Sequence, residues 1–463
     1  MPKVTVILPS LNVSQYIRET LGSVCGQTLE DIEILCVDAG STDGTEEIIK
    51  EYEQSDSRVH YIHSDMRSYG HQMNMGISLA KGEYIGIVET DDYVDTGMFE
   101  DLYRLARENT LDIVKSNYRY FFEGNRKDRF FIKSDLAQEF NVEYNKVFSC
   151  EDFISGKYTN DVYIWDGIYR TEYIREKGIR FNETPGASFQ DWGFKFLTFL
   201  QAQRIMYVEE AYYNYRKDNL GSSTYDTRTV GFIFNEANYV LQKLGDRMLE
   251  NKDLYGVIAK HIMGGHMTAL DELCKWVYPD EKVRDDIIGY IPLIKRFKED
   301  KVYTAETLGL ETWKQTELLL KDPETYIKSK AIMLHAEGQI AIDFIDRCAQ
   351  FEQVVIFGSG KYGKAALTFL RACGEGEKVV AFADNNPNVV GKEIYGVKVI
   401  SPEDAASNYN NALFVIASPS NSTTMRKQLR GLGIEDSDVV VYNYSSSIFT
   451  CTSGINIYKA GKQ

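Results

Sequence analysis

The stretch Tyr84-Ile85-Gly86-Ile87-Val88-Glu89-Thr90-Asp91-Asp92 joins a short apolar run to a dense acidic cluster. The first five residues predict a buried strand, and the last four predict its carboxyl end. Carboxylates packed this closely are costly unless a cation sits among them, and hard divalent ions prefer such oxygen ligands. A cation held there could also bind a diphosphate. The cluster is therefore a candidate site for chemistry in which a nucleoside diphosphate leaves.

Strands and helices alternate around this stretch, as in βαβ units on a parallel sheet. We expect strands at 4–8, 32–37, 59–63 and 84–88, and helices over 14–25 and 45–55. Ligands of open parallel sheets bind at the carboxyl ends of the strands. Each unusual segment there could be only a turn or a cap, but together they predict one binding edge. These segments are Pro9-Ser10-Leu11-Asn12, Asp38-Ala39-Gly40-Ser41, 64–74 and 89–92.

The rest of the chain changes character twice. Residues 111–225 predict an α+β region with strands at 111–117, 162–169 and 205–215 and a hairpin over 121–133. Residues 226–345 have helical periodicity and predict a helical bundle, interpreted as a spacer or a dimer interface. Residues 346–463 predict a Rossmann-like parallel α/β domain. The expected fold class is α/β, with a mixed-sheet N-terminal domain and a helical middle region.

Composition limits the class of protein. The 463 residues are 43% hydrophobic and 26% charged, which is ordinary for a globular chain. A net charge of -16 argues against nucleic acid as a partner. The seven cysteines form no CxxC pair and suggest reduced thiols in the cytoplasm. Neither a signal peptide nor a spanning segment is expected, so membrane contact would be peripheral, at the inner face.

Four motifs in the first half carry a resemblance. The opening Val6-Ile7-Leu8-Pro9-Ser10-Leu11-Asn12 is the first, and Val37–Thr45 is similar to a VDDGSTDGT segment. Residues 74–85 are similar to N-x-G…A-x-G-x-Y-I, and 89–92 to DxDD. In order and spacing they resemble the inverting family 2 glycosyltransferases of the GT-A fold. The resemblance covers residues 1–225, with 1–110 as the nucleotide-sugar half and 111–225 as the acceptor half.

The resemblance implies a role for each matching residue. Asp92 would ligate Mn²⁺ or Mg²⁺, and the ion would neutralise charge on the diphosphate leaving group. Asp38 would hydrogen-bond the nucleoside, and Asp91 would face the ribose and the sugar phosphate. The other donor contacts would be Pro9, Ser10, Asn12, Gln72, Asn74 and, from a segment resembling the family's mobile loop over the diphosphate, Arg216.

Gln190-Asp191-Trp192 resembles the family's segment that supplies the catalytic base. An inverting transfer needs such a base to take the proton of the acceptor hydroxyl. Asp191 could otherwise be a helix N-cap, since a helix is expected directly after it. Two departures from the family pattern are Ala39, where a second Asp is common, and Glu89, which replaces the first Asp of DxDD.

A second glycine motif lies near the C-terminus. Gly358, Gly360 and Gly363 form G-x-G-x-x-G between an expected strand and helix, which is the context of a nucleotide fold. Asp384 ends the next strand, where a ribose-binding acid belongs. The segment 384–397 resembles the small nucleotide-binding domain of sugar O-acyltransferases. Nucleotide binding and a purely structural or assembly role both stay open for this domain.

The sequence thus predicts a metal-dependent, inverting glycosyltransferase of the hexosyltransferase class. The donor would be a nucleoside diphosphate sugar, with UDP as the family's usual nucleotide. The acceptor would be a glycan or a lipid-linked glycan of a bacterial capsule or other surface polysaccharide. The alternatives are a nucleotide-binding assembly subunit without catalysis and an NAD-dependent oxidoreductase that uses the C-terminal motif. A homodimer through the helical or C-terminal region is a further expectation.

Overall fold

The computed structural model describes residues 1–123, 129–155, 157, 163–187, 189–217, 219, 222, 232–263 and 281–443. These residues fall into two compact units, one built mainly from residues up to 323 and the other from residues 324 onward. The predicted helical region is divided between the two units. Its first helices belong to the first unit, and its last, long helix belongs to the second.

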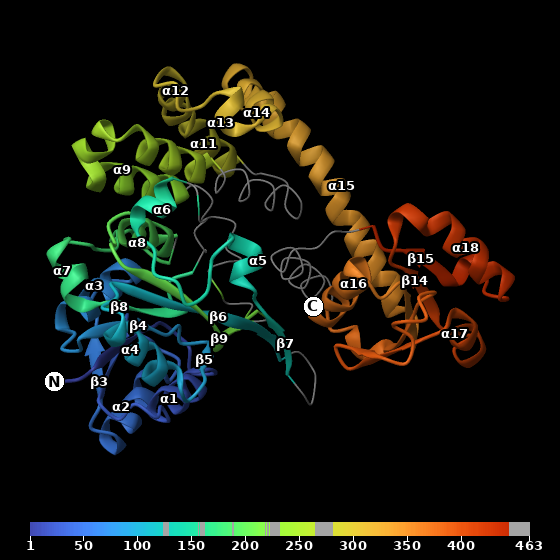
Figure 1. Cartoon of the computed structure of the whole chain (residues 1–463), viewed down its shortest axis with the longest axis horizontal. Coiled ribbons are helices and arrows are strands. Elements are labelled where there is room, and N and C mark those ends of the chain that lie inside the picture. Colours follow the sequence, from blue (N-terminus) through green and yellow to red (C-terminus); the bar gives the residue numbers. More distant parts are fainter. Residues whose placement is uncertain are drawn as a thin grey trace. The chain divides into compact units, whose positions relative to one another are not determined.

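The first unit is built around one mixed β-sheet (Figure 1). In the described residues the strand order is β3-β2-β1-β4-β8-β6-β9-β5, with β7 paired to β6. The first four strands are parallel, as expected, whereas β8 is antiparallel to both β4 and β6. The strands are β1 (Val4–Ser10), β2 (Ile32–Asp38), β3 (Val59–His63), β4 (Tyr84–Ile87), β5 (Tyr93–Val94), β6 (Ile113–Phe122), β7 (Phe130–Lys133), β8 (Gly167–Arg170) and β9 (Ile205–Arg216).

Helices cover the sheet. α3 packs on β1 and β2, and this approach depends on Gly76, because a Cβ there would lie 2.6 Å from Ile7. α4 packs on β8, and α1 packs on α2 and β5. The helices of this part are α1 (Ile17–Cys25), α2 (Thr45–Ser55), α3 (Tyr69–Leu79), α4 (Met98–Glu108), α5 (Leu136–Phe140), α6 (Cys150–Ile154), α7 (Thr171–Glu176) and α8 (Gln190–Phe199).

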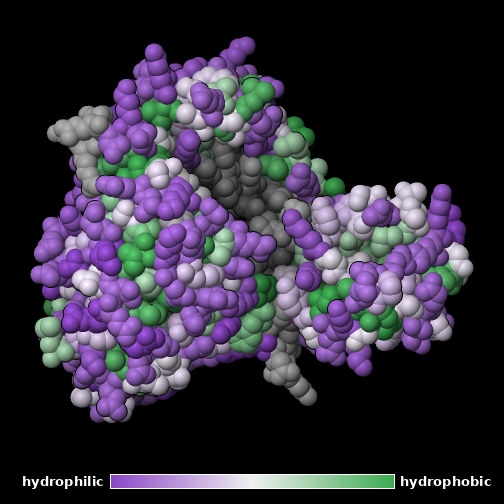
Figure 2. Space-filling view, viewed as in Figure 1, coloured by the Kyte–Doolittle hydropathy of each residue, from purple (hydrophilic) through white to green (hydrophobic). Residues whose placement is uncertain are grey.

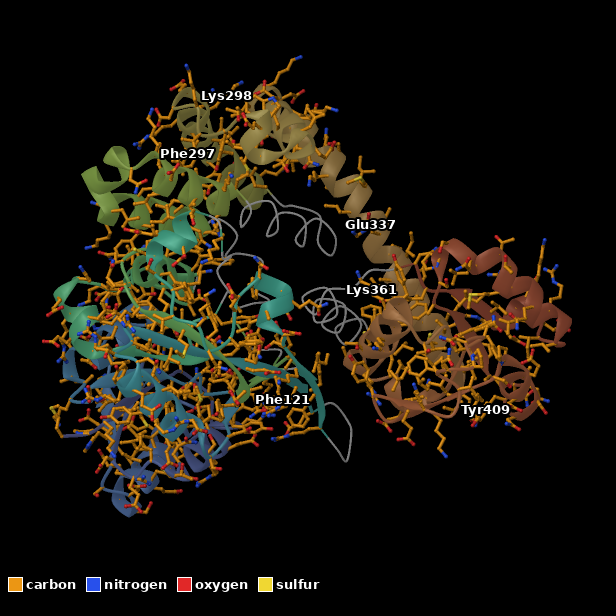
Figure 3. All side chains as sticks on the ribbon, in the orientation of Figure 1. Phe121, Phe297, Lys298, Glu337, Lys361 and Tyr409 are labelled. Carbon is orange, nitrogen blue, oxygen red and sulfur yellow. The ribbon has the colours of Figure 1, made fainter. Side chains whose placement is uncertain are left out.

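The helical region of the first unit starts with α9 (Phe232–Glu250), which packs against α8 and is kinked at Gly245. Residues 252–263 are also helical. Phe297, labelled in Figure 3, is fully buried between the rings of Tyr255 and Tyr303. The later helices are α11 (Glu281–Gly289), α12 (Ile291–Glu299), α13 (Ala305–Leu308) and α14 (Leu310–Lys321).

The second unit combines α15 (Pro323–Ala349) with a second sheet. Its described strands have the order β12-β13-β11-β10-β14-β15 and are parallel except for β12, which confirms the predicted parallel α/β domain. The strands are β10 (Val354–Phe357), β11 (Val379–Ala383), β12 (Glu393–Ile394), β13 (Val397–Ile400), β14 (Leu413–Ile416) and β15 (Val439–Val441). The helices are α16 (Lys361–Ala372), α17 (Pro402–Asn408) and α18 (Ser422–Gly431).

The structure corrects two local predictions. Trp165 and Asp166 precede β8 and do not lie on the strand expected over 162–169. Trp165 is buried and stacks on Tyr163 and Tyr213, so it belongs to the core. α8 begins at Gln190, so Asp191 lies inside the helix and not directly before it. Part of the predicted hairpin over 121–133 lies outside the described residues.

The surface is largely hydrophilic. On the face shown in Figure 2, hydrophobic side chains gather in small separate areas. Among the described residues no helix is both long and apolar enough to span a membrane. Among the described residues, the free thiols are Cys25, Cys36, Cys150, Cys348 and Cys373.

Candidate active site

The strand register brings the expected segments to one edge of the first sheet. Ser10 pairs with Asp38, and Asp38 pairs with His63, so the ends of β1, β2 and β3 are level. β4 is parallel to β1 with Ile87 opposite Ile7, which places the acidic cluster beside Pro9. The hydroxyl of Thr90 donates to the Pro9 carbonyl at 2.8 Å and joins the two ends.

Asp38 holds the turn that follows β2. It is fully buried, and one carboxylate oxygen accepts the backbone N–H groups of Gly40 and Ser41 at 3.0 and 2.9 Å. The other oxygen accepts the hydroxyls of Ser10 and Ser41. This carboxylate was expected to hydrogen-bond the nucleoside. Its four bonds within the protein hold the turn after β2, and its contact with a nucleoside stays a prediction.

Two further expected donor contacts also support the walls. The Asn12 side-chain oxygen accepts the backbone N–H of Thr42 at 2.9 Å, which ties the end of β1 to the turn after β2. The Gln72 amide donates to the carbonyls of Ser10 and Val37 at 2.9 and 2.6 Å, and Gln72 is only 5% exposed. These side chains fix the backbone around the expected donor site.

The two aspartates of the acidic cluster have different surroundings. Asp92 is 1% exposed, and its oxygens accept the Tyr213 hydroxyl at 2.8 Å and the Arg216 backbone N–H at 2.7 Å. Burial raises the pKa of Asp92 well above its usual range. Asp91 is partly exposed, and one of its oxygens accepts the Asn219 amide at 2.7 Å. Burial raises the pKa of Asp91 as well. The metal contact that the sequence assigned to Asp92 stays a prediction.

Arg216 is also engaged within the protein. Its side chain is buried, donates to the Asp91 carbonyl at 2.8 Å and pairs with Glu19 at 2.9 Å. The guanidinium lies over the rings of Tyr16 and Phe121, the latter labelled in Figure 3, at 4.7 and 4.6 Å from their centres. It was expected to contact the diphosphate. In this arrangement it supports the backbone of the acidic cluster, and most of the segment that follows lies outside the described residues.

Glu89 is joined to the start of α3. The Tyr69 hydroxyl donates to its carboxylate at 2.6 Å. Burial raises the pKa of Glu89 to about 8, and the charges of Asp91 and Asp191 act in the same direction. Tyr69 in turn feels the charges of both Glu89 and Asp191. Tyr69 is therefore close enough to both carboxylates for their charges to raise the pKa of its hydroxyl.

The loop before α8 brings Asp191 to this edge. The Tyr69 backbone N–H donates to the Gly186 carbonyl at 3.0 Å, so the loop pairs with the segment after β3. The Gln190 side chain donates to the same carbonyl at 3.1 Å. Phe189 adopts a left-handed φ of 61° directly before the helix. Asp191 thus occupies the first turn of α8, directly after a loop that contacts Tyr69.

Asp191 has the electrostatics of a general base. Burial raises its pKa, and the ammonium of Lys195, one turn along α8, opposes this shift. A raised pKa increases the affinity for a proton taken from an acceptor hydroxyl. A base acts only when deprotonated, so activity should fall as the pH drops through this raised pKa.

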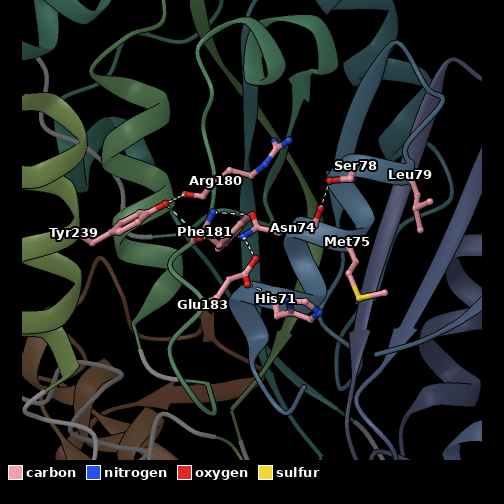
Figure 4. A pocket seen from close by; sticks show the side chains of 9 residues that line it. All are labelled: His71, Asn74, Met75, Ser78, Leu79, Arg180, Phe181, Glu183 and Tyr239. Atoms are coloured by element: carbon pink, nitrogen blue, oxygen red, sulfur yellow. Dashed lines mark hydrogen bonds and ion pairs between the residues drawn. The ribbon is translucent and has the colours of Figure 1, made fainter. Parts of the chain in front are cut away.

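Asn74 holds the segment that leads into the loop. Its amide donates to the Phe181 carbonyl at 3.0 Å and to Glu183 at 2.8 Å, and its oxygen accepts the Phe181 N–H. The same residues border a groove of about 650 Å³ between α3 and α9 (Figure 4). Asn74 was expected to contact the donor, but it anchors this segment. The groove is lined by His71, Asn74, Met75, Ser78, Leu79, Arg180, Phe181, Glu183 and Tyr239.

In the second unit, the residues of the glycine motif and Asp384 pack against and bond to one another. Gly358 has a left-handed φ of 104°, and a Cβ on Gly363 would lie 1.9 Å from the Gly358 carbonyl oxygen, so α16 packs tightly on the loop. Gly360 caps α16. Asp384 accepts the backbone N–H and the hydroxyl of Ser359 at 2.8 and 2.6 Å. The acid expected at a ribose therefore holds the loop itself.

The acidic cluster suits a divalent ion that takes few of its ligands from the protein. Among the described residues no three Asp, Glu, His or Cys side chains form a metal cage. Mg²⁺-type ions in transferases are usually held by one or two carboxylates together with substrate phosphates. Asp91, partly exposed and next to Glu89, suits that mode of binding.

Comparisons with known proteins agree with this geometry. Residues 5–177 match the family model described as Glycosyl transferase family 2. Glycosyltransferase GlyG of Streptococcus pneumoniae is 32% identical over 220 residues, which cover 46% of this chain and 70% of GlyG. The chain belongs to glycosyl transferase family 2. Its mixed sheet and this membership confirm the predicted GT-A fold.

With other relatives, the chain matches a smaller share of the relative's own length. The uncharacterized glycosyltransferase EpsJ of Bacillus subtilis is 33% identical over 219 residues, 47% of this chain and 62% of EpsJ. The GalNAc(5)-diNAcBac-PP-undecaprenol beta-1,3-glucosyltransferase of Campylobacter jejuni is 26% identical over 188 residues, 40% of this chain and 56% of that enzyme. The chain therefore spans less than two thirds of either protein.

The second unit matches a different model. Residues 350–440 correspond to a domain described as C2185-like, N-terminal. That description does not name the sugar O-acyltransferases, so the resemblance expected from the sequence is not confirmed.

Proposed function

We propose that this glycosyltransferase moves a hexose from a nucleoside diphosphate donor, with UDP as the nucleotide, to an acceptor hydroxyl with inversion at the anomeric carbon. The observation that supports the proposal most is the pair of hydrogen bonds made by Tyr69. Its hydroxyl donates to Glu89 of the acidic cluster, and its backbone N–H donates to Gly186 in the loop that leads to Asp191. The acidic cluster and the loop before the proposed base therefore both contact Tyr69.

The acidic cluster would hold Mn²⁺ or Mg²⁺ through Asp91, with Glu89 beside it. When bound, the ion would neutralise the negative charge that develops on the diphosphate as it leaves. Asp92 contributes indirectly, because its bonds to Tyr213 and to the Arg216 backbone fix the strand end on which Asp91 is mounted. Asn219 orients the Asp91 carboxylate by donating to one of its oxygens.

Asp191 takes the proton. The acceptor oxygen forms a bond to the anomeric carbon while the bond from that carbon to the diphosphate oxygen breaks. The proton of the acceptor hydroxyl moves to the Asp191 carboxylate, and the electron pair of the broken bond stays with the diphosphate. Attack from the side opposite the leaving group inverts the configuration, which requires only one side-chain base.

The acceptor is proposed to be a glycan or lipid-linked glycan of a bacterial surface polysaccharide, reached at the inner face of the membrane. The Campylobacter jejuni relative supports this class, because its name gives an undecaprenol-linked glycan as acceptor.

Donor hydrolysis tests the proposal without the acceptor. UDP-glucose, UDP-galactose and UDP-N-acetylglucosamine, with ADP-glucose as nucleotide control, are incubated with the full chain in Mn²⁺ or in excess chelator, and released nucleotide is measured. We expect slow, metal-dependent hydrolysis of at least one UDP-sugar, since water can replace the acceptor at the base. Absence of metal-dependent binding and of hydrolysis for every UDP-sugar would count against the proposed function.

A further inference from the structure

Glu236 is a buried carboxyl group that the reaction described above does not use. It lies on α9, outside the residues that match the family model, and its exposed fraction is 0%. One oxygen accepts the Asn182 amide at 2.9 Å. The other oxygen is buried and has no hydrogen-bond partner among the described residues. An unpaired buried oxygen is costly, so its place calls for a physical reason.

That second oxygen lies in a slot against the first turn of α8. A Cβ built on Gly193 would be 2.4 Å from it, so only a glycine at this position leaves room for the carboxyl group. Gly193 is two residues after Asp191 on the same turn. The Glu236 carboxyl therefore packs directly on the backbone that carries the proposed base.

Glu236 also contacts the other end of the loop that places Asp191. Asn182 precedes this loop, and Gly193 follows it. One turn further along α9, the Tyr239 hydroxyl donates to the Arg180 carbonyl at 3.0 Å, as Figure 4 shows. α9 thus contacts the chain on both sides of the described stretch 183–187, and Glu236 contacts both Asn182 before it and Gly193 after it.

We propose that Glu236 is a positioning residue that fixes the first turn of α8 and with it the orientation and the limited solvation of Asp191. The inference rests on the proposed role of Asp191 as the base. It assigns a part of the catalytic apparatus to the helical region.

The charges around Glu236 agree with a neutral acid. Burial raises its pKa to about 8, and the Asp191 charge acts in the same direction. None of the described cations forms an ion pair with it. The charged or titratable groups on the elements packed here are Asp191 and Lys195 on α8, Arg180 and Glu183 on the segment before the loop, Tyr239 on α9 itself and His261 on the following helix.

Glu236→Gln and Glu236→Ala separate positioning from packing. Glutamine copies the shape of a neutral acid and can still accept from Asn182, so we expect kcat for UDP-sugar hydrolysis within about twofold of wild type. Alanine leaves a space that water can enter, and a small displacement of a base costs about tenfold or more in kcat. Better solvation of Asp191 should also move the acidic limb of the pH–rate profile down by about half a pH unit.

The assay uses the full chain, Mn²⁺ and the UDP-sugar hydrolysed fastest in the panel above, with thermal melting to check folding. Asn238→Ala, an exposed position on the same helix, is the matched control and should change neither kcat nor the acidic limb. Gly193→Ala is the second route, because its Cβ displaces the Glu236 carboxyl from the slot and should reproduce the loss seen with alanine at 236.

Three results would overturn the inference. The first is Glu236→Ala with wild-type kcat and an unmoved acidic limb, and the second is Glu236→Gln as impaired as Glu236→Ala, which would mean that a charge is needed. The third, decisive if Glu236→Ala does not fold, is Gly193→Ala with wild-type kinetics. Full activity of Asp191→Asn would instead show that the proposed base is wrong, so the two failures are distinguishable.

Discussion

Asp191→Asn lowers kcat by about 10²–10⁴-fold, the usual contribution of a general base. The amide keeps the size of the side chain and its place in the first turn of α8, but it cannot accept a proton. Donor affinity should be unchanged, because no described contact of Asp191 belongs to the Glu89–Asp92 cluster. The measurement is kcat for UDP-sugar hydrolysis together with calorimetric titration of UDP in Mn²⁺.

Asp65→Asn is a suitable control for this variant. Asp65 follows β3, and its side chain is 88% exposed. The Asp65→Asn substitution removes the same charge from the same part of the unit. Wild-type kcat is expected for it. If Asp191→Asn retained wild-type kcat with a folded protein, Asp191 would not be the base.

Asp91→Asn and Asp92→Asn are expected to fail in different ways. Asn at 91 weakens the proposed metal contact, so metal-dependent kcat/KM should fall by about 100-fold or more while the melting temperature stays near wild type. Asn at 92 is buried and presents an acceptor oxygen to only one of the two donors, the Tyr213 hydroxyl or the Arg216 backbone N–H. It should therefore destabilise the unit by about 1–3 kcal/mol.

Melting curves and Mn²⁺ titrations of both variants distinguish the two roles. Ser41→Ala controls for a general loss at the binding edge, since it removes one hydroxyl from the turn after β2 without touching the cluster. A stable Asp92→Asn that no longer responds to Mn²⁺, beside an Asp91→Asn that does respond, would restore the assignment made from the sequence.

The sequence predicted the elements that local pattern determines. β3 and α2 have the expected bounds, 59–63 and 45–55. In each case hydrophobic periodicity and a turn residue at the boundary act within a few positions. The binding edge was also predictable, because parallel strands bring their carboxyl ends together whatever their side chains do.

The hydrogen-bond partners of the individual site residues were not predictable from the sequence. Tyr213 donates a hydrogen bond to Asp92, and Asn219 donates one to Asp91. Both residues lie more than 100 residues after the acidic cluster. Tyr69 and Glu236 were missed for the same reason, since a tyrosine or glutamate in a helix gives no local signal of a distant partner. Asp38 and Asp384 lie in ligand-binding motifs and also hold the turns beside them, a second role that the motifs alone do not reveal.

The first-formed anomer of the released sugar distinguishes a single displacement, with Asp191 as the one base, from a double displacement. Hydrolysis of an α-linked UDP-sugar by the full chain in Mn²⁺ is followed by proton NMR before mutarotation mixes the anomers. We expect the β-anomer of the free sugar to appear first. Initial release of the α-anomer would rule out a single displacement at this site.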